Sequence, residues 1–178
     1  AFGTALAQTH SFTYQNGTNL LLTSTDGLNR TTAYTYDGFG NTLTTTLMSG
    51  TGSATTTTYT YNANNQQTSI SAPQNVDANG ITTNAKSSYF YDAIGRSIAS
   101  RDANGNQNTT VYGAANKIIE ERHADGGIVV SRYNLFGDRI SVIQPASANV
   151  TGSVVQTDYA YDRLGQLTRI STGSALNI

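Results

Sequence analysis

Histidine, cysteine and acidic side chains most often hold metals or carry catalysis, and this sequence is poor in the first two. It contains only His10 and His123, far apart, and no cysteine. A zinc site needs three or four ligands, so neither histidine indicates one. Serine and aspartate are abundant enough for a catalytic triad, but no Gly-x-Ser-x-Gly nucleophile motif occurs. Gly38-Phe39-Gly40 lacks the lysine and Ser/Thr of a phosphate-binding loop. We expect no enzyme, no metal and no cofactor.

One acidic segment could be read as the start of a calcium-binding loop. Asp102-Ala103-Asn104-Gly105-Asn106 places oxygen-bearing side chains at loop positions one, three and five. An EF-hand also needs an acidic residue at position twelve, and that position is Gly113. We interpret the segment as a polar turn, and give Asp77 and Asp125 the same interpretation.

Aromatic side chains recur in pairs spaced by two residues, as at Tyr34 and Tyr36 or Tyr89 and Tyr91. Exposed aromatic rings can stack on sugars or bases. In a β-strand, however, residues two apart share a face, which is what a half-buried strand requires. Structural packing is therefore the preferred interpretation, and sugar binding remains an alternative.

The second aromatic residue of each pair, together with the lone Tyr112 and Tyr133, marks a repeat that covers the chain. These anchors fall at positions 14, 36, 61, 91, 112, 133 and 161, so successive spacings are 22, 25, 30, 21, 21 and 28 residues. A minimum spacing with variable excess is typical of repeat arrays in which loops absorb length changes. The sequence thus predicts about seven copies of one unit.

The residues after each anchor have the chemistry of a tight turn. Four places after the anchor only Gly or Asn occurs in the last six copies, and these residues tolerate positive φ. Directly after the anchor, the same six copies carry Asp or Asn, with Gly113 as the exception. This combination predicts a hairpin turn with a G1 bulge. The structural repeat residues are Tyr36, Asp37, Gly40, Tyr61, Asn65, Tyr91, Asp92, Gly95, Tyr133, Gly137, Tyr161, Asp162 and Gly165.

Turn residues also occur midway between anchors, for example Asp26-Gly27-Leu28-Asn29 and Asp125-Gly126-Gly127. Apolar residues return after each anchor turn, and no segment has a helical period. The predicted fold class is all-β: tandem antiparallel hairpins forming a continuous, twisted, spiralling sheet with almost no helix. Residues 1–178 are expected to be one repeat array of about seven hairpin units.

Composition narrows the functional classes. Charged residues make up 12% of the chain and the net charge is -1, which argues against an electrostatic nucleic-acid binder. No apolar run approaches the roughly 20 residues of a membrane span. The chain starts with Ala1 close to its first motif, and we expect it to be an excerpt of a larger polypeptide.

The pattern Tyr-x-Tyr-Asp-x-x-Gly, followed by a polar residue and then Leu or Ile, resembles the Rhs/YD repeat. The match is best at 34–43, 89–98 and 159–167. That family includes bacterial Rhs toxins, the B and C components of Tc toxins, wall-associated proteins and teneurins. The resemblance implies a β-sheet strip that spirals into a hollow shell, which in the toxins encloses a C-terminal toxic domain. The toxins' self-cleaving core contains Asp-Pro motifs. The two prolines here, Pro73 and Pro145, do not follow Asp. The resemblance therefore implies the shell for this chain but not the self-cleaving core.

The leading hypothesis is therefore a structural shell segment of a large secreted Rhs/Tc-type protein that encapsulates a C-terminal toxin or effector. Its expected partners are further YD repeats and the enclosed domain, and its expected location is secreted or on a bacterial cell surface. The alternative is an extracellular adhesive or filament-forming module that assembles through open strand edges, with carbohydrate as a further ligand.

Overall fold

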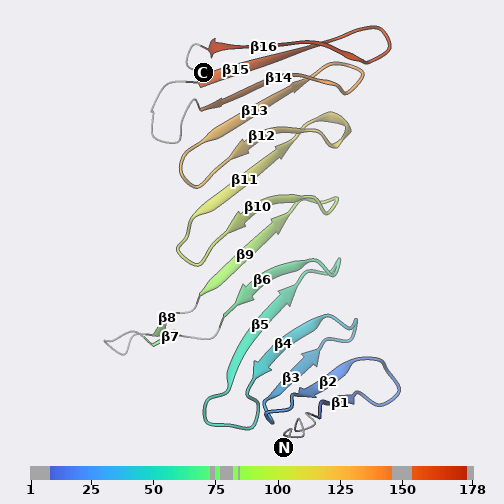
Figure 1. The fold of residues 1–178 in the computed structure, drawn as a ribbon, viewed down its shortest axis with the longest axis vertical. Coiled ribbons are helices and arrows are strands. Elements are labelled where there is room, and N and C mark those ends of the chain that lie inside the picture. Colours follow the sequence, from blue (N-terminus) through green and yellow to red (C-terminus); the bar gives the residue numbers. More distant parts are fainter. Residues whose placement is uncertain (1–8, 73–74, 77–81, 84, 146–153, 176–178) are drawn as a thin grey trace, which may run out of the picture. The chain divides into compact units, whose positions relative to one another are not determined.

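The computed structural model describes residues 9–72, 75–76, 82–83, 85–145 and 154–175 of the 178-residue chain. These residues form β-strands, apart from turns and one short 3-10 helix, η1, at Ala114–Asn116. Fourteen antiparallel strands follow one another in a single open sheet (Figure 1). The predicted all-β fold of tandem hairpins with almost no helix is therefore confirmed. No helix in the described ranges is long and apolar enough to cross a bilayer.

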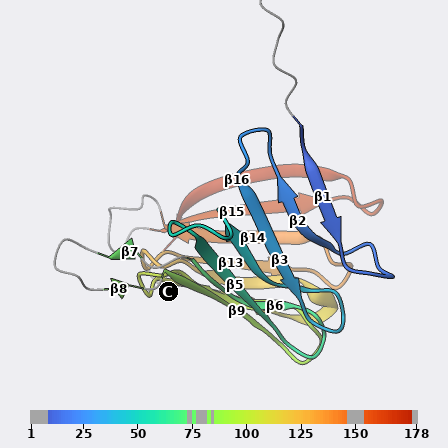
Figure 2. The same cartoon turned by 90° about the horizontal axis from the view of Figure 1, so that it is seen from below.

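The chain divides into two compact units, which we describe separately. The first consists of Ala1–Tyr89 and Asp102–Asn104. Its sheet contains β1 (Ser11–Tyr14), β2 (Leu21–Thr25), β3 (Thr31–Tyr36), β4 (Thr42–Leu47), β5 (Thr55–Tyr61), β6 (Gln67–Ser71) and the first part of β9 (Lys86–Tyr91). Strands adjacent in sequence pair side by side, as Figure 2 shows for β1, β2 and β3.

A small two-stranded ribbon, β7 (Asn75–Val76) with β8 (Thr82–Thr83), lies in the connection between β6 and β9. It accounts for the longest spacing between anchors, the 30 residues from Tyr61 to Tyr91. The predicted turn at Asp77 in this connection lies outside the described residues.

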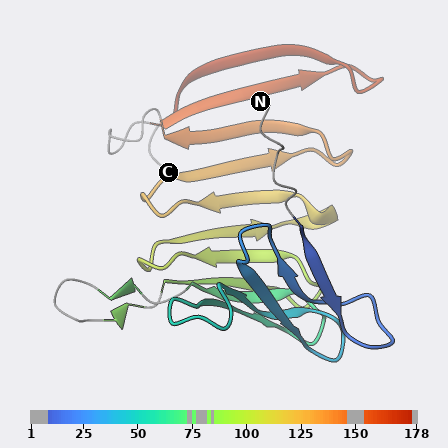
Figure 3. The ribbon, with the colours of Figure 1, turned by 60° about the horizontal axis from the view of Figure 1, so that its bottom comes forward.

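The second unit consists of Phe90–Arg101 and Gly105–Ile178. After the end of β9 it contains β10 (Ser97–Arg101), β11 (Gln107–Tyr112), β12 (Ile118–Arg122), β13 (Ile128–Tyr133), β14 (Arg139–Pro145), β15 (Val154–Tyr161) and β16 (Leu167–Ala175). Figure 3 shows the orange and red strands of this unit as successive antiparallel arrows.

The register shifts by one residue beside the anchor in each hairpin whose pairing can be followed. In the hairpin of β3 and β4, for example, Thr35 pairs with Thr44 but Tyr36 pairs with Thr42. A register shift of this kind is a β-bulge, which adds local twist and lets the turn close. The bulge predicted from turn chemistry is therefore present.

The sheet buries very little. Among the described residues Ile143, which is 4% exposed, is the one hydrophobic side chain counted as buried. Ser69 and Ser141 are the buried polar residues, and the Ser141 hydroxyl has no hydrogen-bond partner. Domains normally bury a core between two packed layers. Here the contacts between neighbouring hairpins must supply much of the stability, and these contacts form the candidate functional site.

Candidate functional site

Each anchor turn is built around the side chain of its opening Asp or Asn. In the first clear copy the Asp37 amide donates to the carbonyl of Asn41 at 2.9 Å, and the Gly40 amide donates to the carbonyl of Asp37 at 3.1 Å. Asp37 Oδ1 accepts from the backbone amides of Phe39 and Asn41, both at 2.9 Å. These amides lie in the turn and have no carbonyl partner on a neighbouring strand, so the carboxylate oxygen accepts their hydrogen bonds instead. An Asp or Asn side chain at this position can supply that oxygen.

The same arrangement recurs at Asn62, Asp92, Asn134 and Asp162, whose Oδ1 atoms accept from the amides two and four residues later. The fourth residue after the anchor has positive φ in the last six hairpins: Gly40 (87°), Asn65 (59°), Gly95 (86°), Asn116 (58°), Gly137 (88°) and Gly165 (78°). The prediction of left-handed backbone at these positions is confirmed. In the first hairpin the left-handed glycine is Gly17, one place earlier.

We call the fifth residue after the anchor the closing residue. In four hairpins its side chain pairs with the second side-chain oxygen or the side-chain amide of the opening residue. Asn41 Nδ2 donates to Asp37 Oδ2 at 2.8 Å, and Arg96 Nε forms an ion pair with Asp92 Oδ2 at 2.6 Å. In two other hairpins the opening asparagine is the donor: Asn62 Nδ2 donates to Gln66 Oε1 at 3.1 Å, and Asn134 Nδ2 to Asp138 Oδ2 at 3.0 Å.

These contacts favour the ionised carboxylates. The hydrogen bond from the Asn41 amide is the largest influence on Asp37 and, with the backbone donors, holds the pKa of Asp37 below its ordinary value. For Asp92, burial is the largest single influence and acts to raise the pKa. The bonds from the backbone and side chain of Arg96 outweigh it, so the pKa of Asp92 is also lowered.

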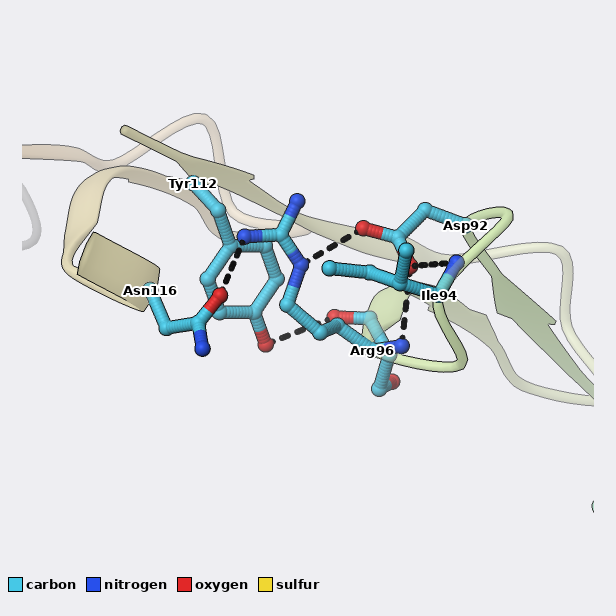
Figure 4. A network of polar contacts seen from close by, with 6 residues as sticks. Asp92, Ile94, Arg96, Tyr112 and Asn116 are labelled. Atoms are coloured by element: carbon cyan, nitrogen blue, oxygen red, sulfur yellow. Dashed lines mark hydrogen bonds and ion pairs between the residues drawn. The ribbon is translucent and has the colours of Figure 1, made fainter. Parts of the chain in front are cut away.

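Closing residues also contact the next hairpin. Figure 4 shows the Arg96 guanidinium lying over the ring of Tyr112, 4.4 Å from its centroid, while Nη1 donates to Asn116 Oδ1 at 3.0 Å. In the first unit Asn41 Nδ2 donates to Asn65 Oδ1 at 2.9 Å. A cation over an aromatic ring contributes about 0.5–1 kcal/mol at an exposed site. Similar stacking places Lys117 over Tyr133 at 5.4 Å and Arg139 over Tyr159 at 5.2 Å.

Anchor tyrosines make a second kind of link between hairpins. The hydroxyl of Tyr36 donates to the carbonyl of Leu21 at 2.8 Å, that of Tyr112 to Ser97 at 2.9 Å, and that of Tyr161 to Arg139 at 3.0 Å. In each case the acceptor opens the return strand of the preceding hairpin. The hydroxyl therefore satisfies a carbonyl beside the bulge, where the ladder is interrupted.

The other predicted anchors, Tyr61, Tyr91 and Tyr133, also end the first strands of their hairpins and are half-buried. Burial, followed by the nearby Tyr59 and Asp37, raises the pKa of the Tyr61 hydroxyl. Their partial burial favours structural packing over an exposed stacking platform.

Gly113, the exception at the opening position, has a packing reason. A Cβ there would lie 2.7 Å from Cγ2 of Ile119, closer than nonbonded carbons approach. Its turn has no side-chain acceptor, and Ala115 and Asn116 both adopt positive φ instead. The sequence pattern shows that Gly113 departs from the repeat, but the contact with Ile119 that explains it is visible only in the structure.

Some turns at the opposite ends of the strands, where the sequence predicts turn residues without a common motif, use the same chemistry. Asp26 Oδ1 accepts from the amides of Leu28 and Arg30, both at 2.9 Å, and Asn29 has a φ of 59°. Asp102 Oδ1 accepts from the Asn104 amide at 2.9 Å, next to Gly105 with a φ of 88°. The Asp102 segment therefore forms a polar turn, as interpreted. Among the described residues no three His, Cys, Asp or Glu side chains cluster as a metal site.

The two faces of the first unit differ in chemistry. Threonine hydroxyls pair across strands on the face opposite the tyrosines, as between Thr35 and Thr44 at 2.6 Å and between Thr46 and Thr56 at 2.9 Å.

At the tips of the anchor turns, apolar side chains point into solvent: Phe39 (81% exposed), Ile94 (71%), Leu135 (103%), Phe136 (92%) and Leu164 (84%).

Comparisons with known proteins agree with the fold. No protein-family model and no curated protein matches this sequence. Among solved structures, a chain in the crystal structure of TcdB2-TccC3-Cdc42 matches with a TM-score of 0.58 and 19% identity, over 86% of this chain and 9% of that chain. A chain in the structure of TcdB2-TccC3-TEV matches with a TM-score of 0.56 and 19% identity, over 86% and 8%. The protein thus has the fold of a stretch spanning less than a tenth of those TcdB2–TccC3 chains.

Proposed function

We propose that this chain is a wall segment of a large secreted or surface-bound bacterial protein of the Rhs/Tc type, whose shell encloses a C-terminal toxin or effector. The observation that carries the proposal is the recurrent coupling of neighbouring hairpins, through the hydroxyls of Tyr36, Tyr112 and Tyr161 and through closing residues such as Asn41 and Arg96. Such coupling lets a sheet be extended hairpin by hairpin without a second layer.

The thinness of the sheet supports the same role. In the described part of the chain, Ile143 is the one buried hydrophobic residue, so this layer gains little from a core of its own. A wall needs surface area more than thickness, and its apolar turn tips would be covered by other parts of a larger protein. The fold likeness to TcdB2–TccC3 chains, of which this chain covers under a tenth, supports a place within a much longer array.

The mechanism is geometric. The strip satisfies its own backbone by strand pairing, excludes proteases and other proteins from the enclosed volume, and catalyses no reaction. Charged residues are 12% of the chain, so the wall binds its cargo only weakly by electrostatics. Its partners are further YD repeats and the enclosed domain, with no role for nucleic acid or a membrane span.

Protease protection in the parent protein tests this function. The parent should form a hollow particle in electron micrographs, and its C-terminal domain should resist a protease that digests the same domain expressed alone. Gly95→Val and Gly137→Val together should open the wall and restore digestion, whereas Ile94→Val and Leu135→Val should not. A parent little longer than this chain, or a C-terminal domain digested at the same rate inside and outside the particle, would contradict the proposal.

A further inference from the structure

We propose that the apolar tips of the anchor turns join this stretch of the sheet to another stretch of the same parent protein's repeat array. Their partner is the opposite long side of the strip, formed by the turns at the other ends of the strands. This inference rests on the proposed function and deepens it, because it names the surface that closes the wall and the chemistry of its partner.

The long sides of the strip are made of turns. In the second unit the anchor turns after β9, β13 and β15 lie on one side of the sheet in Figure 1, and the turns after β10 and β12 lie on the other. We call these sides the anchor edge and the back edge. Turns lack the row of unpaired N–H and C=O groups that a strand edge presents, so backbone pairing cannot join two such edges. A strip that encloses a volume by itself must therefore be joined along these edges by side chains.

The most exposed large apolar side chains of the described residues all stand in turns, and all but Leu28 are on the anchor edge. Four of them take the same place, the third after the anchor, and we call these four the tip residues: Phe39, Ile94, Phe136 and Leu164. Since strands lie about 4.8 Å apart, neighbouring hairpins place such positions about 10 Å apart along the edge. The apolar tip is thus a recurrent property of the anchor edge and not of one turn.

The tip residues are held in place before any partner arrives. Their backbone amides donate to Oδ1 of the opening residue of the turn, at 2.9 to 3.1 Å. The next residue in each of these turns is a left-handed glycine. A side chain presented on a turn fixed in this way loses little backbone entropy when it docks. With exposures from 71% to 92%, the tip residues pack into no core of their own chain.

The back edge of the first unit carries apolar side chains that can receive such tips. Leu28 lies in the turn between β2 and β3 and is 65% exposed. Leu47 ends β4 and Met48 begins the turn that follows it, and they are 51% and 42% exposed. Contact between these side chains and the tip residues would remove apolar surface on both edges from water.

Carboxylates beside the tip residues argue against a lipid partner. Each tip residue stands two positions from an aspartate, as Phe39 does from Asp37 and Phe136 from Asp138. Insertion of the tips into a bilayer would take these carboxylates out of water, which is costly for an ionised group. Contact with another row of polar turns leaves the same carboxylates hydrated.

Photo-crosslinking in the parent protein tests the contact. With p-benzoylphenylalanine in place of Phe136, irradiation should link position 136 to a back-edge turn of another stretch of the array, as identified by mass spectrometry of the digested particle. The matched control carries the same group in place of Thr58, which is exposed on a strand, and should give several-fold less of this product. Links from position 136 to the C-terminal domain, to a second protein or to lipid, no link at all, or equal yields from both positions would overturn the proposal.

Substitution of the tip residues supplies a second readout. Ile94→Asn, Phe136→Asn and Leu164→Asn together change exposed turn positions, so the 178-residue chain should unfold at the same urea concentration as the wild type. In the parent the same three changes should speed protease digestion of the C-terminal domain several-fold. The control, Ala93→Asn with Arg163→Asn, alters the neighbouring places of two of the same turns and should leave the digestion rate unchanged.

The remaining outcomes separate this inference from the proposed function. A wild-type parent that fails to protect its C-terminal domain removes the shell itself. Equal protection in the wild type and in the triple variant leaves the shell in place but overturns the tip residues as its joint. A triple variant that unfolds at lower urea concentration would show that the tips serve the stability of their own hairpins instead.

Discussion

The side-chain amide of Asn41 donates a hydrogen bond to the side-chain oxygen of Asn65, 24 residues later, at 2.9 Å. Asn41 closes one anchor turn and Asn65 is the left-handed residue of the next. The second unit repeats the relationship between Arg96 and Asn116. Where the left-handed residue is Gly137, the closing residue before it, Lys117, still lies against it, with Cε 3.3 Å from the position of a Cβ.

This relationship explains why asparagine replaces glycine in two of the turns. Glycine adopts positive φ at lower cost, but asparagine tolerates it and adds an acceptor. Asn65 and Asn116 use that acceptor to receive a donor from the preceding hairpin. Copies that look degenerate by sequence therefore carry an additional link between hairpins.

Replacing a left-handed glycine with a β-branched residue should destabilise the array. Gly95 has a φ of 86°, where valine is strained, so Gly95→Val should lower the free energy of unfolding by about 1–3 kcal/mol. Urea unfolding followed by circular dichroism measures the change. The neighbouring Ile94→Val alters an exposed tip and should stay within about 0.5 kcal/mol. Equal stability of the Gly95 variant and the wild type would contradict the assigned turn.

Removing a linking hydroxyl should cost one hydrogen bond. Tyr36→Phe deletes the donor to the Leu21 carbonyl and should lower the free energy of unfolding by about 1 kcal/mol. Tyr14→Phe is the matched control, because the Tyr14 hydroxyl has no described partner within its own chain. Both variants should be measured by urea unfolding at low protein concentration. Similar losses in the two variants would show that the hydroxyl–carbonyl contact contributes nothing.

Two arginines in equivalent turns separate the ion pair from the link between hairpins. Within the described ranges Arg30 pairs with Asp26 alone, whereas Arg96 pairs with Asp92 and also contacts Tyr112 and Asn116. Arg96→Met should therefore lower the free energy of unfolding by about 1 kcal/mol more than Arg30→Met. A thermal-unfolding comparison with both single variants checks this difference. If the two variants are equally stable, the contacts drawn in Figure 4 do not stabilise the array.

Acid should weaken the turns that open with aspartate. The pKa of Asp37 is lowered in the folded chain, so its stabilising contribution is complete above the unfolded value of about 3.9. That contribution is lost as pH falls through the lower folded pKa. Asp37→Asn keeps the Oδ1 acceptor but cannot titrate, so its stability should fall less steeply below about pH 4.

The reverse change supplies the control for the acid prediction. Asn62 opens an equivalent turn closed by an amide, so Asn62→Asp should add the same kind of acid sensitivity. Acid titrations followed by circular dichroism should shift in opposite directions for the two variants. Parallel curves for both would show that the opening carboxylate is not the titrating group.

The hairpin itself is predictable from sequence because its determinants are local. Asp92 and Gly95 lie within five residues of chain, and the amides bonded by the first and the positive φ of the second define the turn almost alone. The same local logic holds at Asp26, where the sequence predicts turn residues but, without a preceding Tyr-x-Tyr pair, not the hydrogen bonds of the aspartate side chain.

By itself, then, the amino-acid sequence determined the all-β class, the repeating hairpins and the left-handed turn positions, since each depends on backbone chemistry within a few residues. Only the tertiary structure decided which carbonyl Tyr36 binds, which ring Arg96 covers and which strands remain at the edges. Those contacts join residues 15 or more positions apart, across connections of variable length. The register of one hairpin on the next is set by the whole ladder between them, which no local pattern encodes.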